Sequence, residues 1–225
     1  MDITLTASDG HSFAAYVNGP EDAAAGVVVL PEIFGINPYI RSMVDRYAAQ
    51  GYRAISPSLF DRQTTPEQGL QLGYSPEDIQ RGLGYKRAIH DEIARLDIEA
   101  AAAALSGQHV KLLTGYCWGG YLSWRMACLS DTFTAAVCWH GGGIAKHCHD
   151  TARIPVQMHF GGSDGSIPLS DVEQIRAAQP KVDIHVYPGA GHSFGRDATP
   201  TYHPESAALA WDRTLAFFRQ HGQQA

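Results

Sequence analysis

A cysteine stands at the centre of a glycine-rich segment, residues 115–120, which reads G-Y-C-W-G-G. An apolar stretch, V-K-L-L-T, precedes the segment, and an amphipathic stretch, Y-L-S-W-R-M-A-C-L, follows it. Glycines two positions before and two after a central residue are typical of a nucleophile elbow, a sharp strand-to-helix turn that lifts the central side chain. The start of a helix also stabilises a thiolate. The pattern predicts Cys117 as a nucleophile; the alternative is a tight turn around a small buried thiol.

Two other segments match the serine form of this motif, G-x-S-x-G: residues 161–165 and 191–195. In the first, Pro168 delays the next helix, and only one further strand follows. The second is followed by R-D-A-T-P-T, which does not predict an immediate helix. We therefore interpret these segments as the loops that carry an acid, Asp164, and a base, His192.

Cys117, Asp164 and His192 follow three successive predicted strands in the chain order nucleophile, acid, base. This order is the one found in triads that are built on a nucleophile elbow. Each residue also has a plain structural interpretation when taken alone. Asp164 could cap its own turn, and His192 could be a loop histidine held by packing. The coincidence of order and context favours a Cys-His-Asp triad.

The elements that must position these residues alternate between strand and helix, which predicts a mostly parallel sheet with helices on both faces. Residues 2–6 and 12–17 flank the turn pair Asp9-Gly10 and predict an N-terminal antiparallel hairpin. We expect further strands at 26–30, 52–56, 110–114, 135–139, 155–160 and 182–187. Helices are expected around 40–48, over 76–105 with a break near Gly82 and Gly84, after residue 120, near 169–178 and near 204–220. The polar stretch 61–75 is expected to be a loop over a site.

Composition excludes several classes of protein. The 225 residues show no seam, so we expect a single domain over 1–225. Seventeen Lys and Arg against 23 Asp and Glu give a net charge of −6, and without a basic run this excludes a nucleic-acid partner. The chain shows no signal peptide and no stretch of about 18 apolar residues. We therefore expect a cytoplasmic protein that does not bind membranes, and a monomer.

Cysteine and histidine usage gives no sign of disulfides or of a metal. The four cysteines form no C-x-x-C pair, so we expect free thiols. Residues 147–150 read H-C-H-D, but adjacent residues rarely converge on one tetrahedral ion. We therefore expect no metal, and we interpret this segment as a polar loop.

Five segments together resemble the dienelactone hydrolase family (carboxymethylenebutenolidases), and the likeness covers nearly the whole chain. They are S-D-G-H-S-F near the start, P-E-I-F-G-I-N at 31–37, G-Y-C-W-G-G at 115–120, G-G-S-D at 161–164 and G-A-G-H-S-F-G-R at 189–196. The resemblance implies the α/β-hydrolase fold and hydrolysis of a small-molecule lactone or ester through a thioester on a Cys-Asp-His triad. It also implies that no cofactor takes part.

The same resemblance gives Glu32 a role, because in this family the glutamate of the E-I-F-G motif holds the thiol proton until substrate displaces it. The alternative for Glu32 is a carboxylate that caps the following loop. The backbone N–H groups of Ile33 and Trp118 are expected to form the oxyanion hole.

Substrate selection is expected to depend on two arginines and a tyrosine, which bind a substrate carboxylate in the family. Arg196 matches this pattern, and Arg81 and Tyr85 match through Q-R-x-x-x-Y-K. Trp118 is bulkier than the usual aliphatic residue, which leaves open a general carboxylesterase with a different substrate. A second alternative is a catalytically silent protein that binds ligands or senses redox state through Cys117.

Overall fold

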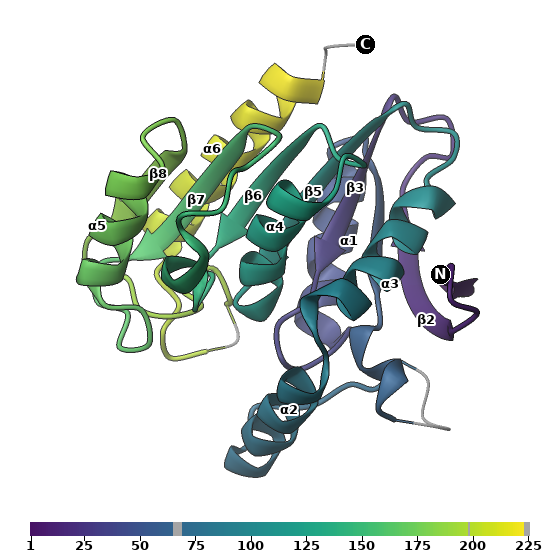
Figure 1. The fold of residues 1–225 in the computed structure, drawn as a ribbon, viewed down its shortest axis with the longest axis horizontal. Coiled ribbons are helices and arrows are strands. Elements are labelled where there is room, and N and C mark those ends of the chain that lie inside the picture. Colours follow the sequence, from purple (N-terminus) through teal and green to yellow (C-terminus); the bar gives the residue numbers. More distant parts are fainter. Residues whose placement is uncertain (65–68, 198, 223–225) are drawn as a thin grey trace. The chain divides into compact units, whose positions relative to one another are not determined.

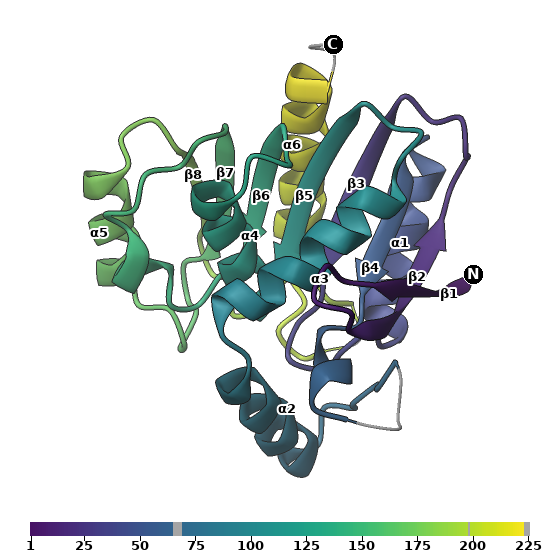
Figure 2. The same cartoon turned by 45° about the vertical axis from the view of Figure 1, so that its right-hand side comes forward.

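The computed structural model describes residues 1–64, 69–197 and 199–222, and Figures 1 and 2 show its ribbon from two directions. The chain forms two compact units, the first comprising Met1–Leu113 and the second beginning at Thr114. The expectation of one domain over 1–225 stays a prediction.

The strands of the first unit confirm the predicted hairpin and the parallel strands beside it. They lie in the order β1-β2-β4-β3-β5, with β5 running on into the second unit. Their bounds are β1 (Asp2–Thr6), β2 (Ser12–Asn18), β3 (Ala25–Leu30), β4 (Arg53–Pro57) and β5 (Val110–Tyr116). β1 pairs antiparallel with β2, β2 pairs antiparallel with β4, and β3 pairs parallel with β4. Every residue of β3 is buried, as its unbroken apolar sequence requires.

Helices cover both faces of the sheet in this unit, with α1 and α3 on opposite sides (Figures 1 and 2). The bounds are α1 (Pro38–Ala49), the short 3-10 helix η1 (Leu59–Arg62), α2 (Pro76–Ala88) and α3 (Asp91–Ala104). The side chains of Asn37 and Ser75 cap α1 and α2 by accepting the N–H of Ile40 and Asp78, each at 3.1 Å. A proline follows each cap, because a missing N–H costs nothing at the first helical position.

The predicted break of the 76–105 helix near Gly82 and Gly84 is wrong. The interruption lies at Ile89 and His90, whose backbones are extended, and a new helix with an acidic first turn follows. Glycine lowers helix stability by about 1 kcal/mol without ending a helix that packing supports. Gly82 has a packing role, since a Cβ at this position would collide with the carbonyl oxygen of Ile33.

In the second unit, β5 is followed by three parallel strands in the order β5-β6-β7-β8. The bounds are α4 (Trp118–Leu129), β6 (Ala135–Trp139), the 3-10 helix η2 (Ile144–His147), β7 (Val156–Gly161), α5 (Leu169–Ala178), β8 (Asp183–Tyr187) and α6 (Pro204–Gly222). Figures 1 and 2 show α4 and α6 on opposite faces of these strands. The predicted α/β class, with helices on both faces of a mostly parallel sheet, is confirmed.

The polar stretch 61–75 is only partly described, because residues 65–68 lie outside the described residues. The described part begins within η1. Further along, Gln71 forms an isolated β-bridge with Gly35. Within the described ranges, no helix combines the length and the apolar character that crossing a membrane would require.

Candidate active site

Cys117 lies at the sharp turn between β5 and α4. Its backbone has φ 54° and ψ −111°, a conformation that L-residues rarely adopt. The flanking glycines allow the turn. A Cβ at Gly115 would collide with the carbonyl oxygen of Gly119, and one at Gly120 would collide with that of Trp139. The turn that the glycine spacing predicts is therefore present. Only glycine fits at positions 115 and 120, because backbone atoms of neighbouring segments occupy the space of a side chain.

Two acceptors meet the backbone N–H of Cys117. One is the carbonyl oxygen of Trp139 at 3.0 Å, and the other is Nδ1 of His140, also at 3.0 Å. Both belong to the end of β6, so the loop after β6 is tied directly to the elbow. A Cβ at Gly141 would lie 2.8 Å from backbone atoms at the start of α4, which shows how closely the two segments approach.

Asp164 and His192 lie on the loops after β7 and β8 and contact each other. Nδ1 of His192 donates to Oδ2 of Asp164 at 2.7 Å. Oδ1 of Asp164 accepts the backbone N–H groups of Ser166 at 2.7 Å and Ile167 at 3.1 Å, and the side chain is fully buried. The two loops are themselves joined, because the N–H of Ser163 donates to the carbonyl oxygen of Ala190 at 2.8 Å.

Hydrogen bonds to both neighbours raise the pKa of His192. Burial of the imidazole lowers its pKa, but the hydrogen bonds to Asp164 and to the side chain of Cys117 outweigh burial and raise the pKa to about 10. The imidazole thus contacts both of the other predicted triad residues, and the protonated form dominates at neutral pH. A thiolate beside an imidazolium is the usual form of an activated cysteine.

Two further predicted residues belong to this unit. Trp118 is the first residue of α4 and is buried. A helix leaves its first N–H groups without intrahelical acceptors, and such groups are the donors of an oxyanion hole. Arg196, four residues after His192, is buried. Its backbone N–H donates to the carbonyl oxygen of Ser193 at 2.9 Å.

The other predicted residues belong to the first unit. Glu32 follows β3 and is fully buried, and Ile33 beside it is also buried. Both Arg81 and Tyr85 are on α2: Arg81 lies 3.8 Å from Asp78 and is half-exposed, whereas the ring of Tyr85 packs on Phe60 at 5.2 Å between centroids. The roles of these four residues toward Cys117 and the substrate stay predictions.

Sequence reasoning missed His140, which no local motif marks as functional. A backbone signal does mark it: among the described residues, Cys117, His140 and Ser193 are the non-glycine residues with positive φ. Strained backbone of this kind clusters at functional sites. Cys117 and His140 come directly after β5 and β6, and Ser193 lies in the loop after β8; ligands of open α/β sheets bind beyond these ends of the strands.

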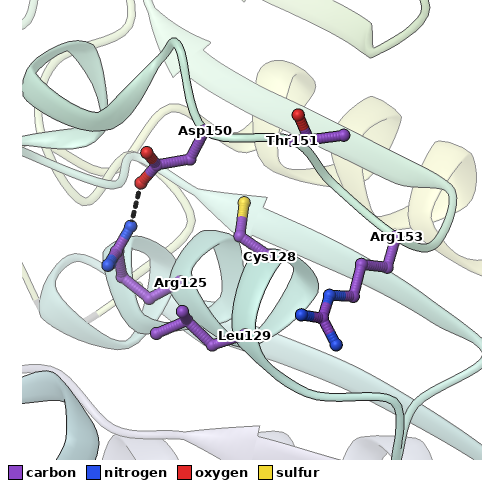
Figure 3. Close-up of a pocket in the computed structure, with 6 residues that line it drawn as sticks. All are labelled: Arg125, Cys128, Leu129, Asp150, Thr151 and Arg153. Atoms are coloured by element: carbon purple, nitrogen blue, oxygen red, sulfur yellow. Dashed lines mark hydrogen bonds and ion pairs between the residues drawn. The ribbon is translucent and has the colours of Figure 1, made fainter.

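A cavity of about 380 Å³ lies at the opposite end of α4 (Figure 3). Cys128 and Arg125 line it, and the guanidinium of Arg125 is paired with the carboxylate of Asp150. Since Cys128 is eleven residues after Cys117, about 16 Å of helix separates this cavity from the elbow. The cavity is therefore remote from Cys117.

The H-C-H-D segment is engaged by neighbouring protein groups. Besides its pair with Arg125, Asp150 lies 3.4 Å from Nδ1 of His147. In the described part of the chain, no group of three or more His, Cys, Asp or Glu side chains is arranged to hold a metal ion.

The chain is similar in sequence and in fold to known proteins. The dienelactone hydrolase family matches residues 13–222. A "Carboxymethylenebutenolidase" of Pseudomonas putida is 35% identical over 228 residues, covering 96% of this chain and 94% of that protein. A "Putative carboxymethylenebutenolidase" of Salmonella typhimurium is 36% identical over 239 residues, covering 98% and 87%. A crystal structure of a "Putative Dienelactone Hydrolase" from Klebsiella pneumoniae has a TM-score of 0.81 at 32% identity, covering 98% of this chain and 99% of that chain.

Proposed function

Because the chain belongs to the dienelactone hydrolase family and is a carboxylic-ester hydrolase, we propose that it opens a lactone or ester through Cys117, His192 and Asp164. The observation that carries this proposal is the continuous hydrogen bonding from Asp164 through His192 to the side chain of Cys117. The strained elbow supports it, because the turn presents Cys117 at a helix N-terminus.

The first step is attack by the Cys117 thiolate on the substrate carbonyl carbon. A C–S bond forms, and the carbonyl oxygen becomes an oxyanion that accepts N–H groups of Trp118 and Ile33. Collapse of this intermediate breaks the ring C–O bond. In a dienelactone the oxygen leaves as an enolate, and the His192 imidazolium is the acid that returns a proton to it.

The second step is hydrolysis of the thioester. With its proton given up, neutral His192 takes a proton from water as the water attacks the thioester carbon. The C–S bond breaks, the carboxylate product leaves, and the thiolate and imidazolium are restored. Asp164 fixes the orientation of the ring throughout and stabilises its charge, as the buried contact at 2.7 Å allows.

Residues of the first unit complete the proposal. Glu32, fully buried after β3, is proposed to take up the Cys117 thiol proton as the substrate arrives and to return it to the thiolate once the product has left. Arg81, Tyr85 and Arg196 are proposed to bind a substrate carboxylate, since an arginine fork matches that group.

The test is turnover of a dienelactone and of p-nitrophenyl acetate by reduced wild type and by Cys117→Ala. We expect wild type to consume the lactone, and Cys117→Ala to lose turnover of both compounds because the nucleophile is gone. Undiminished turnover by Cys117→Ala would remove Cys117 from the mechanism. Ester turnover without lactone turnover would support a general carboxylesterase, and silence of the reduced wild type on both would favour a binding or redox-sensing protein.

A further inference from the structure

We propose that His140, at the end of β6, is a positioning residue for both Cys117 and His192. This inference rests on the proposed function, because a positioning role has meaning only if Cys117 and His192 react with substrate. It assigns a task to a residue that no motif of the chain identifies.

The hydrogen bond at Nδ1 defines the state of the ring. Because Nδ1 of His140 accepts the Cys117 N–H at 3.0 Å, that nitrogen is unprotonated and the proton of the neutral ring is on Nε2. The side chain is fully buried. Burial lowers the pKa of His140 well below its usual value, and the nearby charges of His192 and Arg196 lower it further. The ring therefore stays neutral while His192 carries the positive charge.

His140 occupies this position at an energetic cost. Its φ is 38°, which non-glycine residues rarely adopt, although histidine tolerates it better than most. Its Nε2 is buried with no hydrogen-bond partner in the described part of the chain. A buried donor left in this way destabilises the folded state. A phenylalanine would fill the same space without that cost, so stability alone does not account for a histidine here.

The same ring limits the orientation of the catalytic base. The rings of His140 and His192 pack edge to face with centroids 4.8 Å apart, and the ring of Phe194 packs on His140 at 6.2 Å. Asp164 fixes His192 through Nδ1, and contact with His140 restrains rotation about that hydrogen bond. One side chain thus touches the backbone of the nucleophile and the ring of the base.

Three substitutions separate the positioning role from simple packing. His140→Phe keeps a ring of similar size and removes the acceptor. His140→Gly also removes the acceptor and relieves the positive φ, so it tests the proposal even if the phenylalanine does not fold. His140→Asn keeps a short side-chain acceptor and tolerates positive φ. His185→Phe is the matched control, because His185 on β8 pairs with Asp183 and stacks on His159 instead.

The measurements are kcat and KM for p-nitrophenyl acetate, the pH dependence of Cys117 alkylation, and the melting temperature. We expect His140→Phe and His140→Gly to lower kcat about ten- to a hundredfold with little change in KM, because misplaced reacting groups slow the chemical step. Their alkylation profile is expected to shift, whereas His140→Asn recovers most of the rate and His185→Phe behaves as wild type.

Two outcomes would overturn the inference. One is a wild-type kcat in folded His140→Phe or His140→Gly, and the other is equal loss in His140→Asn and His140→Phe with an unchanged alkylation profile. Cys117→Ala, measured in parallel, distinguishes the two proposals: its full activity would remove the proposed function, whereas its inactivity beside a fully active His140→Phe would remove only the role of His140.

Discussion

Asp164 uses both of its carboxylate oxygens, and each has a separate task. Oδ1 accepts two backbone N–H groups and so holds its own loop, whereas Oδ2 accepts Nδ1–H of His192. The interpretation of Asp164 as a turn residue and its proposed role as the triad acid are therefore compatible with each other. A substitution that alters only one of the two oxygens tests the two tasks separately.

Asp164→Asn is such a change, since its amide oxygen can keep the two loop contacts while its NH₂ group cannot accept from His192. We expect a variant that still folds, with its loop contacts kept, and a kcat lower by about 10³- to 10⁴-fold, because the imidazole loses its orientation and its charge partner. Chemical denaturation and steady-state kinetics check both parts. Asp171→Asn, on α5, is the matched control. A kcat within a few-fold of wild type would contradict the assignment of Asp164.

The raised pKa of His192 predicts a pH-dependent stability. The pKa is about 10 in the folded protein against an ordinary value of 6.5, so the folded state holds the proton more tightly than the unfolded state. The stabilising contribution of His192 is therefore complete below pH 6.5 and is lost as pH rises through about 10. Urea unfolding of wild type and His192→Gln measures it as a difference in free energy of unfolding. A difference that grows with pH over this range would contradict the prediction.

At this scale the sequence predicts Cys117, Asp164 and His192, because glycine spacing and strand order are local signals. His140 is not predictable in this way. Its contact with Cys117 joins residues 23 positions apart and depends on how β6 ends beside α4. Nothing in A-A-V-C-W-H distinguishes a functional histidine from one that packs.

Glycines have opposite roles in two elements, the elbow and α2. Gly115 has no room for a Cβ, whereas a Cβ at Gly84 would meet no atom within 4 Å. The sequence predicts a helix break at Gly82 and Gly84 because glycine is unfavourable in helices. The structure instead packs Gly82 against the backbone of Ile33, and no local sequence signal indicates a contact so distant along the chain.

Alanine substitution at these two positions is expected to change stability in opposite directions. Gly115→Ala lowers the free energy of unfolding by about 1–3 kcal/mol or more, because the elbow must shift to admit a methyl group. Gly84→Ala raises it by about 0.5–1 kcal/mol, because alanine loses less backbone freedom in a helix interior. Urea denaturation of both variants beside wild type measures the two changes. Stabilisation by Gly115→Ala would show that the elbow backbone has more space than the structure indicates.

Over the whole chain, the four cysteines differ in accessibility. Cys117 is half-buried, whereas Cys128, Cys138 and Cys148 are buried. Burial raises the pKa of the Cys128 thiol to about 11, with a smaller contribution from Asp150, and raises that of Cys138 still further. A thiol reacts with alkylating reagents as its thiolate, so exposure favours Cys117, whereas the raised pKa values disfavour Cys128 and Cys138.

We therefore expect iodoacetamide to modify one thiol quickly in the folded protein and all four in urea. Peptide mass spectrometry should locate the fast site at Cys117, and Cys117→Ala should show no fast phase. Rapid modification of Cys128 would contradict this expectation and would mean that the cavity of Figure 3 admits the reagent to its sulfur.

The positive φ of Cys117 also has a practical consequence for capturing the enzyme with its substrate. Such backbone strain costs about 1–3 kcal/mol, and glycine relieves it at a smaller entropic cost. Cys117→Gly removes the sulfur and the strain in one substitution, whereas Cys117→Ala removes only the sulfur. The proposed mechanism makes both variants inert, and the glycine variant is the better choice for crystallographic trapping of an intact lactone because it is more firmly folded.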